Sequence, residues 1–237
     1  GGDAAFEVAR LGYGVVLTYR SSPRQAQQVV EAIEAVGRQA VALHLDVEQA
    51  DSFPAVAETV RSTLREQWGR DQFDALLNNA GYGVNMPFVD TTEAQFDSMM
   101  RVHVKAPFFL TQALLPMLRD GGRVLNVSSG LARFCLPGHA AYGSAKAAVE
   151  TLSRYMAKEL GERGISVNAI APGAIETDFG GGAVRDNEEI NQQVSSVTAM
   201  GRAGQPSDIG AVMAQLLSPA SQWITGQRIE ASGGMFL

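Results

Sequence analysis

Short apolar runs recur along the chain at residues 15–19, 40–45, 73–77, 123–127 and 166–170. Each run has the length of a β-strand and is followed by Asn, Ser, Asp or a Pro-Gly pair. The runs are largely apolar instead of alternating with polar residues, which is typical of parallel strands buried between two layers of helices. The pattern therefore predicts buried parallel strands at these positions.

Longer amphipathic segments lie between the runs. Residues 25–36 carry apolar side chains at the i, i+3, i+4, i+7 spacing of one helical face, namely Val29, Val30, Ile33 and Val36. Residues 96–118, 140–161 and 207–217 predict further helices, the last with Ser207 as its N-cap. No repeat, low-complexity tract or linker interrupts the alternation. We therefore expect one α/β domain over residues 1–237, a doubly wound parallel sheet with helices on both faces.

The start of the chain differs from what such a sheet needs for a dinucleotide. A dinucleotide-binding sheet begins with a strand and a glycine-rich turn that lays the pyrophosphate on a helix N-terminus. Here Gly1-Gly2 leads at once into a helix-like segment that ends at Gly12. We interpret Gly1 as the last glycine of that turn, and we expect the first strand and most of the turn to lie upstream of residue 1.

Composition narrows the function. The formal net charge of -6 leaves no basic excess to neutralise nucleic-acid phosphates. No apolar run approaches the roughly 20 residues of a membrane span. The single cysteine, Cys135, is compatible with a reducing cytoplasm, where we expect the protein to act. His44 and His139 have no partners at metal-ligand spacing, so no metal site is expected.

The sequence Tyr142-Gly-Ser-Ala-Lys146 carries the strongest chemical signal. On a helix, residues i and i+4 share a face, so the phenol and the ammonium point into one site. A free tyrosine has a pKa of about 10 and transfers protons poorly near neutral pH. A nearby ammonium favours the phenolate, so we expect Lys146 to lower the pKa of Tyr142 and suit it to proton transfer with a carbonyl oxygen.

Other motifs fall at the carboxyl ends of the predicted strands. Asn78-Asn79-Ala80-Gly81 follows one strand, Ser128-Ser129 ends the next thirteen positions before Tyr142, and Pro172-Gly173 with Thr177 ends the following one. In this order the motifs resemble those of the short-chain dehydrogenase/reductase family, and the C-terminal ITGQRIEASGG resembles its last strand region. The resemblance covers essentially the whole chain and implies a Rossmann-like fold and a nicotinamide cofactor.

The resemblance also implies roles. Tyr142 would be the general acid in ketone reduction, Lys146 would hold the nicotinamide ribose, and Ser129 would bond the substrate oxygen. The other residues that it places at the cofactor are Gly1, Asp46, Val47, Asn79, Gly81, Pro172, Gly173, Ile175 and Thr177. One position departs from the family pattern, because His103 stands where an Asn is usual. His103 either replaces that residue as part of the catalytic site or is a packed helix histidine.

The segment after residues 15–19 indicates which cofactor is used. NAD-selective members of the family have an acidic residue at the end of this strand, where it binds the ribose hydroxyls. Here Tyr19 is followed by Arg20 and Ser21. A guanidinium can pair with the 2′-phosphate that a carboxylate would repel, so these residues predict NADP(H).

Three functions fit these observations. The first is an NADP(H)-dependent oxidoreductase that interconverts a small-molecule ketone and a secondary alcohol. The second is a 3-oxoacyl-carrier-protein reductase, for whose acidic partner only Arg119 and Arg133 offer basic docking residues. The third is a non-catalytic dinucleotide-binding regulator. The apolar residues of the segments 96–118 and 140–161 further predict a homotetramer, or a dimer, built across these helices.

Overall fold

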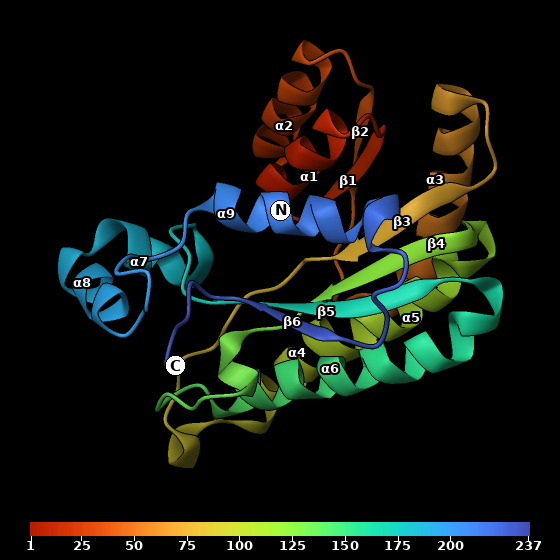
Figure 1. Ribbon diagram of the computed structural model, residues 1–237. Coiled ribbons are helices and arrows are strands. Elements are labelled where there is room, and N and C mark those ends of the chain that lie inside the picture. The colour runs from red at the N-terminus through yellow and green to blue at the C-terminus, as the bar shows by residue number, and fades with distance from the viewer.

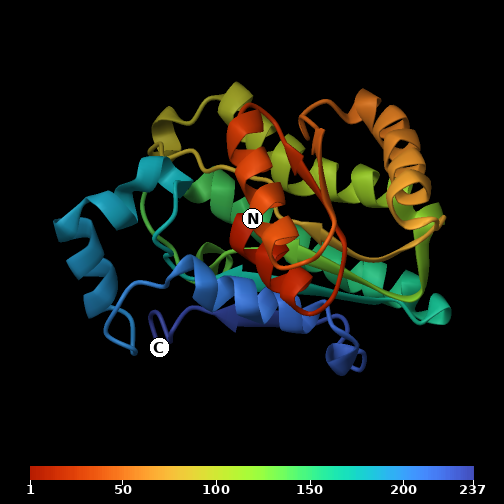
Figure 2. The same cartoon turned by 90° about the horizontal axis from the view of Figure 1, so that it is seen from above.

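The computed structural model describes residues 1–237, and its parallel strands lie between two layers of helices (Figures 1 and 2). The strands are β1 (Val15–Tyr19), β2 (Ala40–His44), β3 (Phe73–Asn78), β4 (Leu118–Val127), β5 (Ser166–Pro172) and β6 (Arg228–Ala231). The helices are α1 (Gly2–Arg10), α2 (Pro23–Ala35), α3 (Phe53–Trp68), α4 (Glu93–Met100), α5 (Ala106–Leu114), α6 (Ala140–Leu160), α7 (Ala183–Asp186), α8 (Glu188–Ser196) and α9 (Pro206–Leu216). The predicted α/β class with doubly wound, parallel strands is confirmed.

Backbone pairing divides the strands into two groups. β1 pairs with β2, and a separate sheet has the order β3-β4-β5-β6, with every pair parallel. No backbone bonds join β1 to β3. A cavity of about 970 Å³ is lined by residues of both strands and by residues of α1 and α5. The facing edges of β1 and β3 therefore have no strand between them.

The helices divide between the two faces of the strands (Figure 1). On one face α1 and α9 pack against β4 and β5, with the buried side chains Ala4, Leu125, Ile170, Ile209 and Met213. On the other face α6 packs against β4 and β5, and α3 packs with α5. Successive residues of β4 serve both layers, because Val124 contacts the α6 side and Leu125 the α9 side. This two-sided burial explains the apolar runs of the sequence.

Two details of the helices differ from expectation. Helix α9 begins one residue earlier than predicted, with Pro206 in its first turn and Gln205 as the N-cap, so the assignment of Ser207 as N-cap is wrong. Proline presets the backbone for that first turn. The segment predicted as one helix over 96–118 is divided between α4 and α5 by a π-helical turn, Arg101–Lys105. The segment ends earlier than predicted, because Leu118 is the first residue of β4.

None of the helices combines the length and apolar character that a membrane crossing requires. No cluster of three or more His, Cys, Asp or Glu side chains is arranged to hold a metal ion.

Candidate active site

Ser129, Tyr142 and Lys146 come from two adjoining elements. Ser129 follows the carboxyl end of β4, and the other two residues lie one turn apart on α6. The strand end is fixed to its neighbour by the Ser128 amide, which donates to the Ile170 carbonyl at 2.7 Å. Ser129 then begins a short 3₁₀ turn whose Leu131 amide donates to the Ser129 hydroxyl at 3.2 Å. The serine is thus held on the sheet edge that faces α6.

The structure brings these three side chains together. Tyr142 and Lys146 are buried, with 6% and 5% of their surfaces exposed. Ser129 lies near enough to Tyr142 to lower the pKa of its phenol. Lys146 Nζ lies 5.5 Å from the centre of the Tyr142 ring and donates to the Val127 carbonyl at 2.7 Å. Ser128, by contrast, turns away to donate to Glu150 at 2.6 Å, so the second serine is the one that meets the tyrosine.

Burial dominates the electrostatics of this group. Desolvation raises the pKa of Tyr142 to about 12, against a lowering effect of its hydrogen bond with Ser129. Desolvation also lowers the pKa of Lys146 to about 7. The net lowering of the tyrosine pKa that we expected from Lys146 is not seen, because desolvation of the phenolate raises that pKa. Tyr142 carries its proton at neutral pH.

His103 lies within the same group. It belongs to the π-helical turn between α4 and α5, with 2% of its surface exposed. Its ring meets the Tyr142 ring edge-on, with the centres 5.1 Å apart, and its Nε2 lies 2.7 Å from the Tyr82 carbonyl. Because a carbonyl only accepts, Nε2 carries the hydrogen, and the buried Nδ1 has no partner. Desolvation, followed by the charge of Lys146, lowers the pKa of His103 to about 3.

The residues predicted to bind the cofactor follow the carboxyl ends of several strands. Arg20 and Ser21 follow β1, Asp46 and Val47 follow β2, and Asn79 follows β3. The Asp46 carboxylate accepts from the Glu48 amide at 3.0 Å and so shapes the turn after β2. Arg20 lies 3.5 Å from Glu48 and 5.6 Å from the centre of the Tyr82 ring.

At this edge of the strands two glycines lie in close contact with neighbouring side chains, an arrangement that is compatible with a bound dinucleotide. A Cβ on Gly1 would lie 2.9 Å from the Asn79 side chain, so the start of α1 abuts the end of β3. A Cβ on Gly81 would lie 2.6 Å from the His103 ring, so residue 81 has no room for a side chain. The beginning of a helix, adjacent glycine backbone and the half-exposed guanidinium of Arg20 together provide the donors that a phosphorylated dinucleotide needs.

The segment after β5 forms another border of the site. Gly173 donates to the Ala231 carbonyl at 3.2 Å, and Ile175 pairs with Gly204 in an isolated β-bridge. The Thr177 hydroxyl accepts from the Phe179 amide at 3.2 Å. The Phe179 ring lies 5.8 Å from that of Tyr142, centre to centre. The following residues, 180–182, are three glycines with positive φ.

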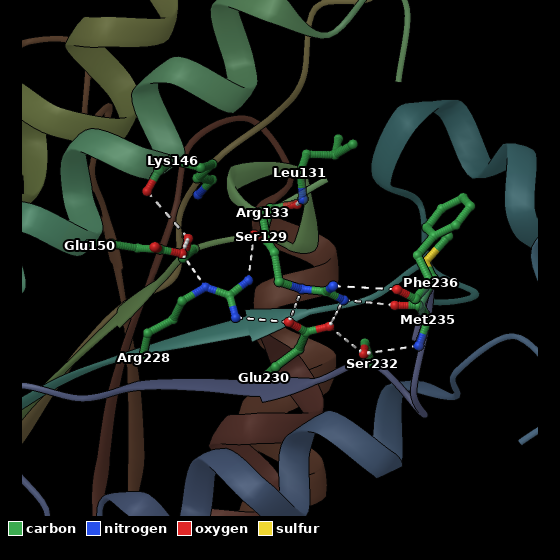
Figure 3. A network of polar contacts seen from close by, with 11 residues as sticks. Ser129, Leu131, Arg133, Lys146, Glu150, Arg228, Glu230, Ser232, Met235 and Phe236 are labelled. Carbon is green, nitrogen blue, oxygen red and sulfur yellow. Dashed lines mark hydrogen bonds and ion pairs between the residues drawn. The ribbon is translucent and has the colours of Figure 1, made fainter. Parts of the chain in front are cut away.

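Sequence reasoning missed several residues that support the site. Glu48 and Tyr82 hold Arg20, and nothing in their local sequence indicates this role. Arg228 and Glu230 lie on β6, yet they reach the Ser129 turn through hydrogen bonds (Figure 3). Glu150 could have been found, since it follows Lys146 by one helical turn.

A serine, a tyrosine and a lysine beside a glycine-bordered edge of parallel strands define a dinucleotide-dependent oxidoreductase. A family profile described as Enoyl-(Acyl carrier protein) reductase matches residues 1–236. The chain belongs to the short-chain dehydrogenase/reductase family. The hydroxynaphthalene reductase-like protein Arp2 of Metarhizium brunneum is 36% identical over 99% of this chain and 90% of its own length.

Solved structures give the same result. The promiscuous reductase LugOII, which catalyses keto-reduction at C1 during lugdunomycin biosynthesis, is 37% identical with a TM-score of 0.94, covering 100% of this chain and 93% of its own. The angucycline C-6 ketoreductase LanV with bound NADP is 35% identical with a TM-score of 0.90, covering 97% of this chain and 90% of its own. The chain is thus an NADP-dependent enzyme that interconverts ketones and alcohols, and the predictions of family, cofactor and reaction class are confirmed.

Proposed function

We propose that this enzyme reduces a ketone carried on a planar aromatic ring system, with Tyr142 as the proton donor. The observation that carries the proposal is the buried Tyr142, with Ser129 near its hydroxyl and Lys146 beside its ring. The substrate class rests on two further observations. Phe179 adds an aromatic surface next to Tyr142, and LanV has been crystallised with NADP and rabelomycin. Arp2 bears hydroxynaphthalene in its name.

The residues act in defined ways. When bound, NADPH supplies the hydride. Tyr142 donates its phenolic proton to the carbonyl oxygen, and its protonated state at neutral pH is the form that reduction requires. Ser129 donates a hydrogen bond to the same oxygen as negative charge develops there. Lys146, anchored on the Val127 carbonyl, orients toward the ribose and faces the tyrosine.

His103 belongs to the catalytic group in this proposal. Its ring fixes the edge of Tyr142, and its neutral form keeps a second positive charge away from Lys146. A charged imidazole here would be buried without a counter-ion, which is strongly unfavourable.

The cofactor would be held along the strand ends. We assign Arg20 and Ser21 to the 2′-phosphate, and Asp46 and Val47 to the adenine. The dinucleotide would further contact Gly1, Asn79, Gly81, Tyr142, Lys146, Pro172, Gly173, Ile175 and Thr177. The donors and the close backbone approaches at Gly1 and Gly81 support this assignment.

We further infer a homotetramer in the cytoplasm. Phe108 and Phe109 on α5 are 45% and 43% exposed and contact each other, and Tyr155 is exposed on α6. Apolar side chains that remain exposed on neighbouring helices favour an isologous contact with a second copy. The lone Cys135, exposed and reduced, suits a reducing compartment.

The test of the function is Tyr142→Phe. Oxidation of NADPH is followed by absorbance with fused-ring aromatic ketones, an alicyclic ketone and a 3-oxoacyl thioester. We expect Tyr142→Phe to lower kcat by about 10²- to 10⁴-fold, because the proton donor is lost while the ring and its packing remain. The Kd of NADPH should not change. Tyr155→Phe is the matched control, since Tyr155 lies on the same helix outside the catalytic group. The substitution keeps the ring that the proposed subunit contact uses, so the variant should keep full activity.

Other outcomes identify the alternatives. A Tyr142→Phe enzyme that keeps more than half of the wild-type kcat contradicts the assignment of Tyr142. Turnover of the thioester alone would indicate a carrier-protein reductase, although Arg119 and Arg133 are already paired with Asp74 and Glu230. Binding of NADPH without turnover of any ketone would indicate a regulator.

A further inference from the structure

The side chain of Arg228 connects the last strand to the Ser129 turn (Figure 3). From β6, its Nε donates to Glu150 at 2.7 Å and its Nη1 to Glu230 at 2.8 Å. Its Nη2 donates to the backbone carbonyl of Ser129 at 3.4 Å. Each of the three guanidinium nitrogens therefore donates a hydrogen bond, and each has a different acceptor.

Glu150 extends this contact to the residue before the serine. The carboxylate oxygen that accepts from Arg228 also accepts from the Ser128 hydroxyl at 2.6 Å. Ser128 in turn lies 3.3 Å from the Lys146 carbonyl on α6. Arg228 thus holds the Ser129 carbonyl directly. It also holds the Ser128 side chain indirectly, through Glu150.

The charges of the network balance. Arg133 donates to both carboxylate oxygens of Glu230 at 2.7 Å, so Glu230 stands between two arginines. The hydrogen bond from Arg133, with further bonds from Arg228 and Ser232, lowers the pKa of Glu230 to about 2. Two arginines and two carboxylates leave no net charge. Glu230 therefore stays ionised, and keeps both arginines bound, across the pH range in which the enzyme is assayed.

The direction of the Ser129 hydroxyl depends on this backbone. Its oxygen already accepts from the Leu131 amide at 3.2 Å, and it lies near enough to Tyr142 to lower the pKa of the phenol. A shift of the 128–130 backbone would move the hydroxyl away from the tyrosine and from the oxygen that both side chains are to contact. Displacements near 1 Å in a reacting group reduce turnover by about 10²-fold.

We propose that Arg228 is a positioning residue for the ketone reduction, which fixes Ser129 by holding its carbonyl and, through Glu150, the side chain of Ser128. The proposal rests on the proposed function of Ser129 and Tyr142. It requires an arginine, because a lysine has one nitrogen and cannot reach Glu150, Glu230 and the Ser129 carbonyl together.

A double-mutant cycle between Arg228→Lys and Ser129→Ala tests this. In the wild-type background Arg228→Lys should lower kcat about 10- to 100-fold, with the KM for NADPH unchanged. In the Ser129→Ala background the same substitution should have almost no further effect, because Arg228 acts only through Ser129. The control Arg133→Gln disturbs the same Glu230 without touching the serine, and it should stay within about twofold of the wild-type kcat.

A second variant and two fold controls distinguish a loss of positioning from a loss of folding. Glu150→Gln breaks the ion pair from the other side and keeps an acceptor for Ser128, so it should also lower kcat. Thermal unfolding and the Kd of NADPH identify any variant that has lost its fold. The proposal is overturned if the effects of Arg228→Lys and Ser129→Ala on kcat are additive in free energy. It is also overturned if folded Arg228→Lys and Glu150→Gln keep the wild-type kcat, or if Arg133→Gln lowers kcat as much as Arg228→Lys does. A wrong proposed function gives a different result, since Ser129→Ala and Tyr142→Phe would then keep wild-type turnover.

Discussion

Arg20 is held by two neighbours at the end of β1. Its guanidinium lies near the Glu48 carboxylate and over the ring of Tyr82. Glu48 also accepts from the Tyr82 hydroxyl at 3.1 Å. A 2′-phosphate that binds Arg20 must therefore compete with a carboxylate already present, which makes Glu48 a determinant of how strongly the phosphate is recognised.

We expect Arg20→Ala to raise the KM for NADPH by about tenfold or more, because a charge-assisted pair contributes about 1.5–3 kcal/mol. The KM for NADH should hardly change. Steady-state kinetics with both cofactors measure this. Glu48→Gln is the companion variant, and it should lower the KM for NADPH because Arg20 loses its competing partner. Equal losses with both cofactors in Arg20→Ala would mean that the arginine only supports its loop.

His103 makes stability depend on pH. Its pKa is about 3 in the folded chain, against about 6.5 for an unfolded histidine. Below pH 6.5 the unfolded chain binds a proton that the folded chain does not, so the free energy of unfolding falls as the pH falls toward 3. At pH 5 the loss should be about 2 kcal/mol.

Denaturant unfolding at pH 7 and pH 5 checks the histidine prediction. His103→Asn, which cannot titrate, should remove this part of the pH dependence. The control His44→Asn changes an exposed histidine on β2 and should retain it. An unchanged slope in His103→Asn would show that other groups cause the acid sensitivity.

Part of the site could be predicted from the sequence because the residues concerned lie close to one another along the chain. Tyr142 and Lys146 are separated by one helical turn, so spacing alone places them on one face. Arg228 lies 99 positions from Ser129, and only the pairing of β6 with β5 brings them together. His103 was recognisable as unusual, but its edge-on contact with Tyr142 depends on a π-helical turn that no apolar periodicity indicates.

At the scale of elements, burial decided which strands could be predicted. The predicted strands are apolar because helices cover both of their faces. β6 has the sequence RIEA, and its charged residues serve the network around Ser129, so its pattern gives no strand signal. The apolar segment after residue 96 continues smoothly through the helices, which is why the division between α4 and α5 could not be anticipated.

The edges of β1 and β3 that face the cavity lead to a prediction about the sheet. We expect a strand supplied between them to join the two sheets. A strand there would bond on both sides, and each ladder hydrogen bond contributes about 0.5–1.5 kcal/mol net.

Comparison of the 237-residue chain with a chain extended upstream tests this. The longer chain should have a higher Tm and a lower Kd for NADPH, and amides of β1 and β3 should exchange more slowly with deuterated solvent. The amides of β5, already paired on both sides, serve as the internal control. Equal exchange, Tm and Kd in the two chains would contradict the expectation.

At the scale of the whole molecule, the exposed aromatic residues of α5 predict assembly. Light scattering at micromolar concentration should give about four times the 25.2 kDa of the chain, or twice that mass if only one interface forms. Phe109→Glu should shift the mass downward, because a charge in an apolar interface is left unpaired. Phe88→Glu, at an exposed site outside α5, should not. A monomeric mass for the wild-type protein would refute the prediction.

The three consecutive glycines at 180–182 separate two parts of the molecule that can change independently. Before them, Ser129, Tyr142 and Lys146 stand on β4 and α6, and after them α7 and α8 lie at one end of the molecule, away from the sheet (Figures 1 and 2). A duplicated gene can therefore accumulate substitutions and length changes in this peripheral segment without disturbing proton transfer.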